Sequence, residues 1–117
     1  MKLSEYITKD SGARQDFDSG MRRDILKGKP RFDLIWQPGI KRIAELYGRG
    51  AEKYGDRNWE LANTVEEMER FKGCAYRHFY QWFNNENPEE DHMAAICFNI
   101  FAAEMVKKKL GENSGSK

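Results

Sequence analysis

The segment 64-TVEEMERFKGCAYRHFYQWFN-84 decides the fold class of this chain. Thr64 and Glu67 have the spacing of a capping box, in which a hydroxyl and a carboxylate satisfy backbone N–H groups at a helix start. The apolar residues that follow recur at helical spacing: Met68, Phe71, Ala75, Phe79 and Trp82. The pattern predicts a helix over roughly 64–84, with His78 on the flank of its apolar face.

Two further helices are predicted on either side of this segment. Pro38 marks an entry turn, and apolar residues at helical spacing from Ile40 to Tyr54 predict a helix over roughly 39–54. A third helix is expected over roughly 89–110, with Asn87 as its cap and Pro88 in its first turn. No strand alternation is convincing. The sequence therefore predicts an all-α fold, a small helical bundle of about three main helices.

The ends of the chain are polar. Residues 1–30 are rich in Gly, Asp, Arg and Lys, and are expected to form an extended N-terminal arm that packs on the body. The helical domain is expected over 31–110, and residues 111–117 are expected to form a flexible tail. A single domain of 117 residues buries only a modest core, so we expect an oligomer that covers the remaining aromatic side chains.

Composition excludes several classes of protein. A formal net charge of +1 argues against nucleic acid as a partner, because such domains are normally strongly basic. No apolar run approaches 18 residues, so no membrane association is expected and the predicted location is cytoplasmic. The two histidines lack zinc-protease spacing, and no zinc site is predicted.

The run 50-GAEKYGDRNW-59 is the first candidate for a ligand site. Tyr54 and Trp59 can stack on a base, Asn58 can contact its edge, and Lys53 can neutralise a phosphate. The alternative is structural: aromatic residues commonly close a core, and Asn is a good turn former.

Two other clusters are its possible companions. Glu89-Glu90-Asp91 is expected in the first turn of the third helix, where carboxylates either favour the helix dipole or hold a hard divalent cation. His92 and Asn99 share one stripe of that helix beside small alanines, which leaves room for a ligand or for a second helix. Arg77 and His78 are adjacent on the second helix and should point about 100° apart, so they are not expected to face the same atom.

The ordered motifs resemble a phage and prophage family, the N-terminal domain of dATP/dGTP diphosphohydrolases. The resemblance rests on 11-SGAR-14, 20-GMRRD-24, 28-GKPRFDL-34 and 50-GAEKYGDRNW-59, followed by Arg77-His78 and Glu90-Asp91-His92 with Asn99. It covers about residues 11–105, and it implies the host cytoplasm as the location if a phage encodes the protein. The family implies hydrolysis of a purine deoxynucleoside triphosphate to the monophosphate and pyrophosphate.

The nearest functional analogy is with MazG-like all-α pyrophosphatases, which bind Mg²⁺ through Glu-x-x-Glu and a later Glu-x-x-Asp. Here Glu66-x-x-Glu69 is present, but Pro88 occupies the position that would complete the second motif with Asp91. The MazG residues therefore do not transfer, and the site is placed on the motifs of this family.

The resulting hypothesis assigns roles as follows. Mg²⁺ is held by Glu90 and Asp91, with Glu52 as a further ligand. The triphosphate is bound by Lys53, Arg77 and the arm residues Arg14, Arg23, Lys29 and Arg31. Tyr54, Asn58 and Trp59 seat the purine, and Asn99 lies in the same binding site. Catalysis is assigned to Asp91 with His78 or His92, which would position the water or protonate the leaving group. Two alternatives stay open: a non-catalytic module that sequesters a nucleotide, and a helical protein that docks on a host partner.

Overall fold

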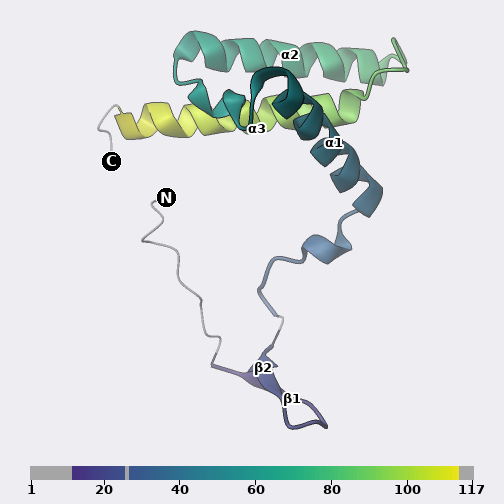
Figure 1. The fold of residues 1–117 in the computed structure, drawn as a ribbon, viewed down its shortest axis with the longest axis vertical. Helices are drawn as coiled ribbons and strands as arrows, with labels where there is room; N and C mark the ends of the chain where they lie inside the picture. Colours follow the sequence, from purple (N-terminus) through teal and green to yellow (C-terminus); the bar gives the residue numbers. More distant parts are fainter. Residues whose placement is uncertain (1–11, 26, 114–117) are drawn as a thin grey trace. The chain divides into compact units, whose positions relative to one another are not determined.

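A computed structural model describes residues 12–25 and 27–113, which divide into two units between Phe32 and Asp33. The first unit contains a short antiparallel hairpin, β1 (Arg14–Asp16) and β2 (Arg22–Asp24) (Figure 1). No strand was expected there. The hairpin closes because Gly20, at φ +97°, completes a turn in which its N–H donates to the carbonyl of Phe17. Residues 1–11 of the predicted arm lie outside the described residues.

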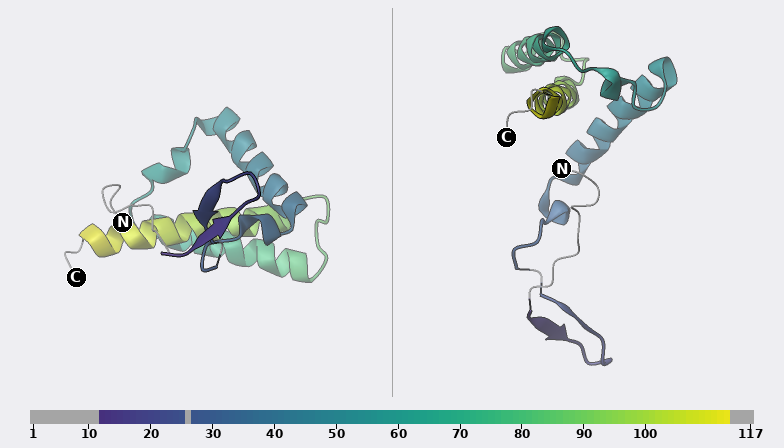
Figure 2. Two further views of the ribbon diagram at one scale, coloured as in Figure 1. Left: turned by 90° about the horizontal axis from the view of Figure 1, so that it is seen from below. Right: turned by 90° about the vertical axis from the view of Figure 1, so that its left-hand side faces the viewer.

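The second unit is helical, as the sequence predicts. Its elements are α1 (Gln37–Tyr54), the 3₁₀ turn η3 (Asn58–Leu61), α2 (Val65–Phe83) and α3 (His92–Asn113), and the 3₁₀ turn η2 (Phe32–Leu34) lies at the division between the units. Helices α2 and α3 run side by side as a hairpin, and α1 crosses α3 (Figures 1 and 2). Within the described residues, none of the helices combines the length and apolar character that a bilayer span requires.

The capping box of α2 is confirmed. The Thr64 hydroxyl accepts from the backbone N–H of Glu67 at 3.1 Å. In return, one carboxylate oxygen of Glu67 accepts from the backbone N–H groups of Asn63 at 2.8 Å and Thr64 at 3.0 Å. These bonds satisfy N–H groups that have no partner inside the helix, so α2 begins where the sequence predicts.

The start of α3 differs from the prediction. Asn85 and Asn87 both adopt positive φ, at +57° and +48°, a conformation that a right-handed helix cannot contain. Helix α3 begins only at His92, so Glu89 and Glu90 lie in the connection before α3 rather than in its first turn. Asp91 is the cap, since its Oδ1 accepts from the backbone N–H of Ala94 at 3.1 Å. At the other end α3 continues through Asn113, beyond the predicted limit of 110, and residues 114–117 of the predicted tail are outside the described residues.

Small side chains on α3 allow α2 to approach closely. The buried apolar residues of α3 are Ala94, Ala95, Ala102, Ala103 and Val106. Phe98 lies at the centre of the aromatic core, with ring edges meeting Tyr47 of α1 at 5.2 Å and Phe71 of α2 at 6.3 Å between centroids. Helix α2 therefore packs against the alanine side chains of α3 along much of the length of that helix.

The apolar face predicted for α2 is partly wrong. Phe79 and Trp82 are 47% and 54% exposed, whereas Ala75 and His78 are buried. The stripe that faces α3 is centred on these two buried residues, which moves Phe79 and Trp82 to its edge. In the described unit these aromatic rings are left at the surface.

Candidate functional site

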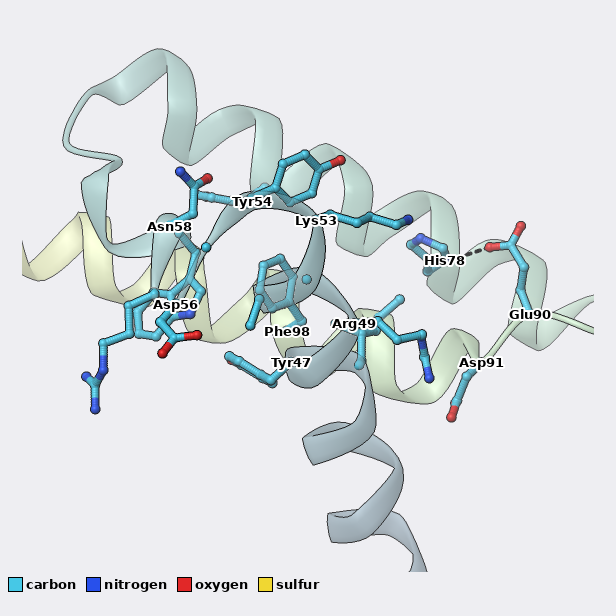
Figure 3. A pocket seen from close by; sticks show the side chains of 18 of the residues that line it. Tyr47, Arg49, Lys53, Tyr54, Asp56, Asn58, His78, Glu90, Asp91 and Phe98 are labelled. Carbon is cyan, nitrogen blue, oxygen red and sulfur yellow. Dashed lines mark ion pairs between the residues drawn. The ribbon is translucent and has the colours of Figure 1, made fainter.

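A cavity of about 1190 Å³ lies in the second unit, between the end of α1, the η3 turn and the connection that leads into α3. Its apolar lining is aromatic and comes from four elements: Tyr47, Tyr54, Trp59, Phe71 and Phe98. Its charged lining comes from the end of α1 and the turn after it, with Arg49, Lys53, Asp56 and Arg57, and from the connection into α3, with Glu89, Glu90 and Asp91. Figure 3 labels Arg49, Lys53 and Asp56 of the first group and Glu90 and Asp91 of the second. The cavity exceeds the roughly 300–1,000 Å³ typical of small-molecule sites, so a nucleotide fits within it.

The turn after α1 has its shape because of two left-handed residues. Gly55 ends the helix at φ +94°, and its N–H donates to the carbonyl of Ala51 at 2.8 Å. Arg57 follows at φ +59° and begins η3. The two reversals bring Asn58 and Trp59 back beside the last turn of α1, where they line the same cavity as Lys53 and Tyr54.

Asp91 already has partners for both of its carboxylate oxygens. Arg42 of α1 donates from Nε to Oδ2 at 2.8 Å and from Nη2 to Oδ1 at 2.7 Å, and Oδ1 also accepts from Ala94. The Arg42 guanidinium is the main reason that the pKa of Asp91 lies below its usual value. A divalent cation on Asp91 would have to share the carboxylate with the positively charged Arg42.

The predicted Mg²⁺ set does not fit as one site. Asp91 is engaged by Arg42, and Glu52 is not among the residues that line the cavity in the described structure. Only Glu90 of the three predicted ligands joins a cluster with other metal-binding side chains, and its companions there are His78 and His92. Two imidazoles are not ligands that Mg²⁺ prefers.

His78 and His92 are buried against each other, with Nδ1 atoms 3.0 Å apart. The pKa of His78 is lowered, first because burial disfavours the charged ring and then because Arg77 is close. Arg77 Nη2 lies 3.4 Å from His78 Nε2, and of the two residues only His78 lines the cavity in the described structure. The flexible arginine folds back along the helix to reach the ring.

The structure brings together seven of the residues proposed from the sequence: Lys53, Tyr54, Asn58, Trp59, His78, Glu90 and Asp91 all line the cavity. His92 does not line it and contacts His78 instead. Asn99 is buried, and its amide donates to the carbonyl of Ala95 within α3 at 2.8 Å. Trp59 packs edge-on against Tyr47, with ring centroids 6.0 Å apart. These contacts of Asn99 and Trp59 support the alternative that both residues have a structural role.

The four arm residues assigned to the triphosphate belong to the first unit. Arg14 pairs with Asp24, and Lys29 Nζ lies 3.7 Å from the same carboxylate. Arg23 lies in β2 opposite Gln15, and its side chain is exposed, as is that of Arg31. A phosphate clamp formed by this arm stays a prediction.

Sequence reasoning missed Arg42 and Arg49. Arg49 lies four residues before Lys53, a spacing that places both cations on one face of α1, and this signal was available from the sequence. Arg42 had no such signal, because its partner Asp91 is 49 residues away.

The chain was compared with known proteins. A family model described as dATP/dGTP diphosphohydrolase, N-terminal, matches residues 18–114. No curated protein and no solved structure matches the chain. The matched range includes every described residue that lines the cavity.

Proposed function

Because the chain belongs to the dATP/dGTP diphosphohydrolase N-terminal family, matched over residues 18–114, we propose that it hydrolyses dATP or dGTP to the monophosphate and pyrophosphate. The family expected from the motifs is confirmed. We place the reaction in the cytoplasm, as a step of phage nucleotide metabolism.

One observation carries this proposal: the large cavity combines an aromatic lining with both basic and acidic side chains. Tyr54 and Trp59 offer faces on which a purine can stack, which is worth about 1–3 kcal/mol per base in other proteins. Arg49 and Lys53 lie one helical turn apart and suit the charges of a triphosphate. A purely structural cavity would not need both features.

The proposed reaction is attack of a water molecule on the α-phosphorus. The bond between that phosphorus and the bridging oxygen breaks, and pyrophosphate leaves with the bonding electrons. The proton released by the water passes to Glu89, the lining carboxylate next to the cluster of His78, Glu90 and His92. Arg49 and Lys53 stabilise the charge that develops on the departing pyrophosphate.

Mg²⁺ belongs to this proposal as the cation that accompanies the triphosphate. It commonly binds proteins through few carboxylates, retains several waters and takes its remaining ligands from phosphate oxygens. The roles proposed above for the side chains that line the cavity do not depend on where that ion binds.

We also propose that the chain self-associates through a second groove, which lies between α2 and α3. Tyr76, Phe79 and Ile100 line this groove and are each about half exposed or more. Its rim carries Lys72 and Lys107 together with Glu104, so a second copy would offer complementary charges. Exposed apolar groups gathered in one groove are typical of protein interfaces.

The test is product analysis by phosphorus NMR with dATP and dGTP, with and without Mg²⁺. The expected products are one monophosphate and one pyrophosphate per substrate. Binding of nucleotide without pyrophosphate release would instead support the sequestering module. No shift of the melting temperature with any nucleotide would support the host-interaction protein.

A further inference from the structure

The protonation state of His92 follows from its surroundings. His92 is 4% exposed, and its Nε2 lies 2.9 Å from the backbone oxygens of both Glu86 and Asn87. Carbonyl oxygens only accept hydrogen bonds, so Nε2 carries the proton. In the neutral ring, Nδ1 therefore presents a lone pair. Histidines that bind metals in proteins are commonly held in this way, with the second ring N–H on a carbonyl or carboxylate.

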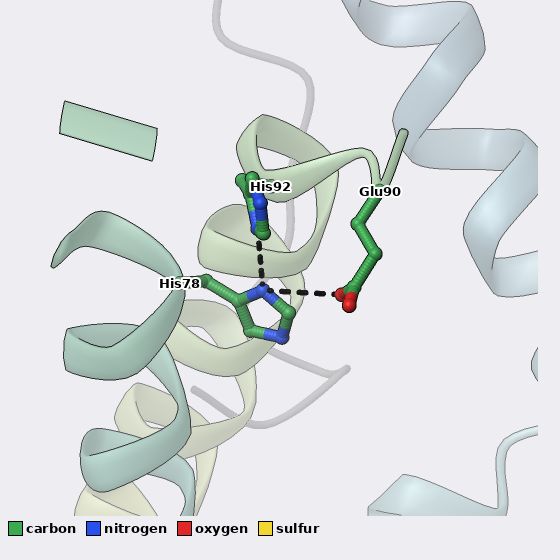
Figure 4. Close-up of side chains that lie close together, drawn as sticks. All are labelled: His78, Glu90 and His92. Carbon is green, nitrogen blue, oxygen red and sulfur yellow. Dashed lines mark hydrogen bonds and ion pairs between the residues drawn. The ribbon is translucent and has the colours of Figure 1, made fainter. Parts of the chain in front are cut away.

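The lone pair on His92 Nδ1 lies close to two other atoms that can bind a metal ion, one from His78 and one from Glu90. His78 Nδ1 is 3.0 Å from His92 Nδ1, and a carboxylate oxygen of Glu90 is 3.9 Å from His78 Nδ1. One ligand atom from each of the three residues lies within 4.8 Å of the other two (Figure 4). The residues come from α2, from the start of α3 and from the connection between them.

We propose that His78 Nδ1, His92 Nδ1 and the Glu90 carboxylate bind one first-row divalent cation of the Zn²⁺ type. Two imidazoles and a carboxylate are a ligand set of catalytic zinc sites, whereas Mg²⁺ favours oxygen. The site replaces the predicted set of Glu52, Glu90 and Asp91. Its role in hydrolysis rests on the proposed function, but binding of the ion does not.

The distances suit a single ion. With bonds of about 2.0–2.2 Å, two donors of a tetrahedral ion lie roughly 3.4 Å apart. The separations of 3.0 Å and 3.9 Å from His78 Nδ1 bracket that value, and the third, between His92 and Glu90, is within 4.8 Å, so side-chain shifts on the order of 1 Å would complete the site. Glu90 is the most accessible of the three, with 48% of its side chain exposed, and it can adjust.

The competing arrangement is a chain of hydrogen bonds without an ion. His78 would donate from Nδ1 to His92 Nδ1 and accept from Arg77 at Nε2, over 3.4 Å. Ion binding moves the His78 proton from Nδ1 to Nε2 and gives up the Arg77 contact. The separation of 3.4 Å is long for a hydrogen bond, so giving up this contact costs little stability.

The location of the cluster gives the ion access to a ligand. His78 and Glu90 line the large cavity, while His92 lies behind them. An ion held by three protein ligands keeps a position for water or a phosphate oxygen, as catalytic zinc sites do.

The experiment titrates the full chain, freed of metals by a chelator, with Co²⁺ and follows visible d–d absorption. One Co²⁺ per chain is expected, with displacement by Zn²⁺. His92→Gln should abolish the absorption, and Glu90→Gln should weaken Co²⁺ binding by more than about tenfold. Glu89→Gln is the matched control, since the neighbouring carboxylate is outside the cluster, and its binding should equal that of the unmodified protein.

Two results overturn the inference: no Co²⁺ absorption in the unmodified protein, or unchanged Co²⁺ binding in Glu90→Gln. The second does not depend on whether the buried histidine variant folds. Co²⁺ binding without pyrophosphate release from dATP or dGTP would keep the site and refute the proposed function. Pyrophosphate release by a protein that does not bind Co²⁺ or Zn²⁺ would support the proposed function and refute the metal site.

Discussion

Arg42 of α1 holds both carboxylate oxygens of Asp91 at the start of α3, across 49 residues of sequence. The same carboxylate caps α3 through the N–H of Ala94. Asp91 therefore joins two helices and starts one of them. These contacts give Asp91 a structural role at the edge of the cavity, distinct from the catalytic role assigned to it from the sequence.

Asp91→Asn and Asp91→Ala should differ in stability. Asparagine keeps the cap but loses the ion pair, which is partly exposed, so the free energy of unfolding should fall by about 1 kcal/mol. Alanine also loses the cap and should cost about 1 kcal/mol more. Urea unfolding of the three proteins measures both steps. Equal stability of the two variants would show that the cap contributes nothing.

Phe98→Ala should loosen the packing of α1 on α3. The ring contacts Tyr47 and Phe71 and is partly buried, so we expect a loss of about 2–3 kcal/mol in the free energy of unfolding. Phe101→Ala is the matched control on the same helix, because that ring is 55% exposed. Similar losses in both variants would contradict the central position of Phe98.

The capping box should make the start of α2 sensitive to acid. The pKa of Glu67 is lowered, first by the backbone N–H of Asn63 and then by the Thr64 hydroxyl. A lowered carboxyl pKa means that its stabilisation is present above the unfolded value of 4.5 and is lost as pH falls through the lower folded value.

Glu67→Gln tests this dependence, because the amide does not titrate over that range. The unmodified protein should melt at a higher temperature than the variant at neutral pH, and the difference should shrink at acid pH, once the pH falls through the lowered pKa of Glu67. Melting curves followed by circular dichroism at both pH values give the comparison. A constant difference would exclude Glu67 as the titrating group.

Arg49→Gln should weaken nucleotide binding in the cavity. Loss of one charge-assisted phosphate contact is expected to raise the Kd for dATP or dGTP about tenfold, with little change in the melting temperature of the free protein. Lys41→Gln is the control, since Lys41 is an exposed cation of α1 that does not line the cavity. Calorimetric titrations would settle the assignment, and equal effects in the two variants would reject it.

Phe79→Glu should shift the protein towards the monomer. A carboxylate in the groove between α2 and α3 would remain buried without a partner when a second copy docks. Phe101→Glu places the same charge on α3 outside that groove and should leave the assembly unchanged. Light scattering after size-exclusion chromatography reports the mass, and a monomeric unmodified protein would refute the interface.

Local signals in the sequence identified most of the secondary structure. The Thr64–Glu67 capping box and the helical spacing of apolar residues determine where α1 and α2 lie, because these patterns depend on neighbours a few residues apart. The start of α3 was misplaced, since the positive φ of Asn85 and Asn87 depends on how the connection folds back. The β1–β2 hairpin was missed because its strands are only three residues long.

The sequence alone also indicated the family and the candidate ligand site in the turn 50–59, since both rest on consecutive residues such as Lys53 and Trp59. Only the tertiary structure decided which side chains line the rest of the cavity and how they pair with one another. It paired Asp91 with Arg42 and brought His78 to His92 across the α2–α3 connection. The direction of a side chain between two helices is set by packing around the whole core, and spacing along the chain does not encode it.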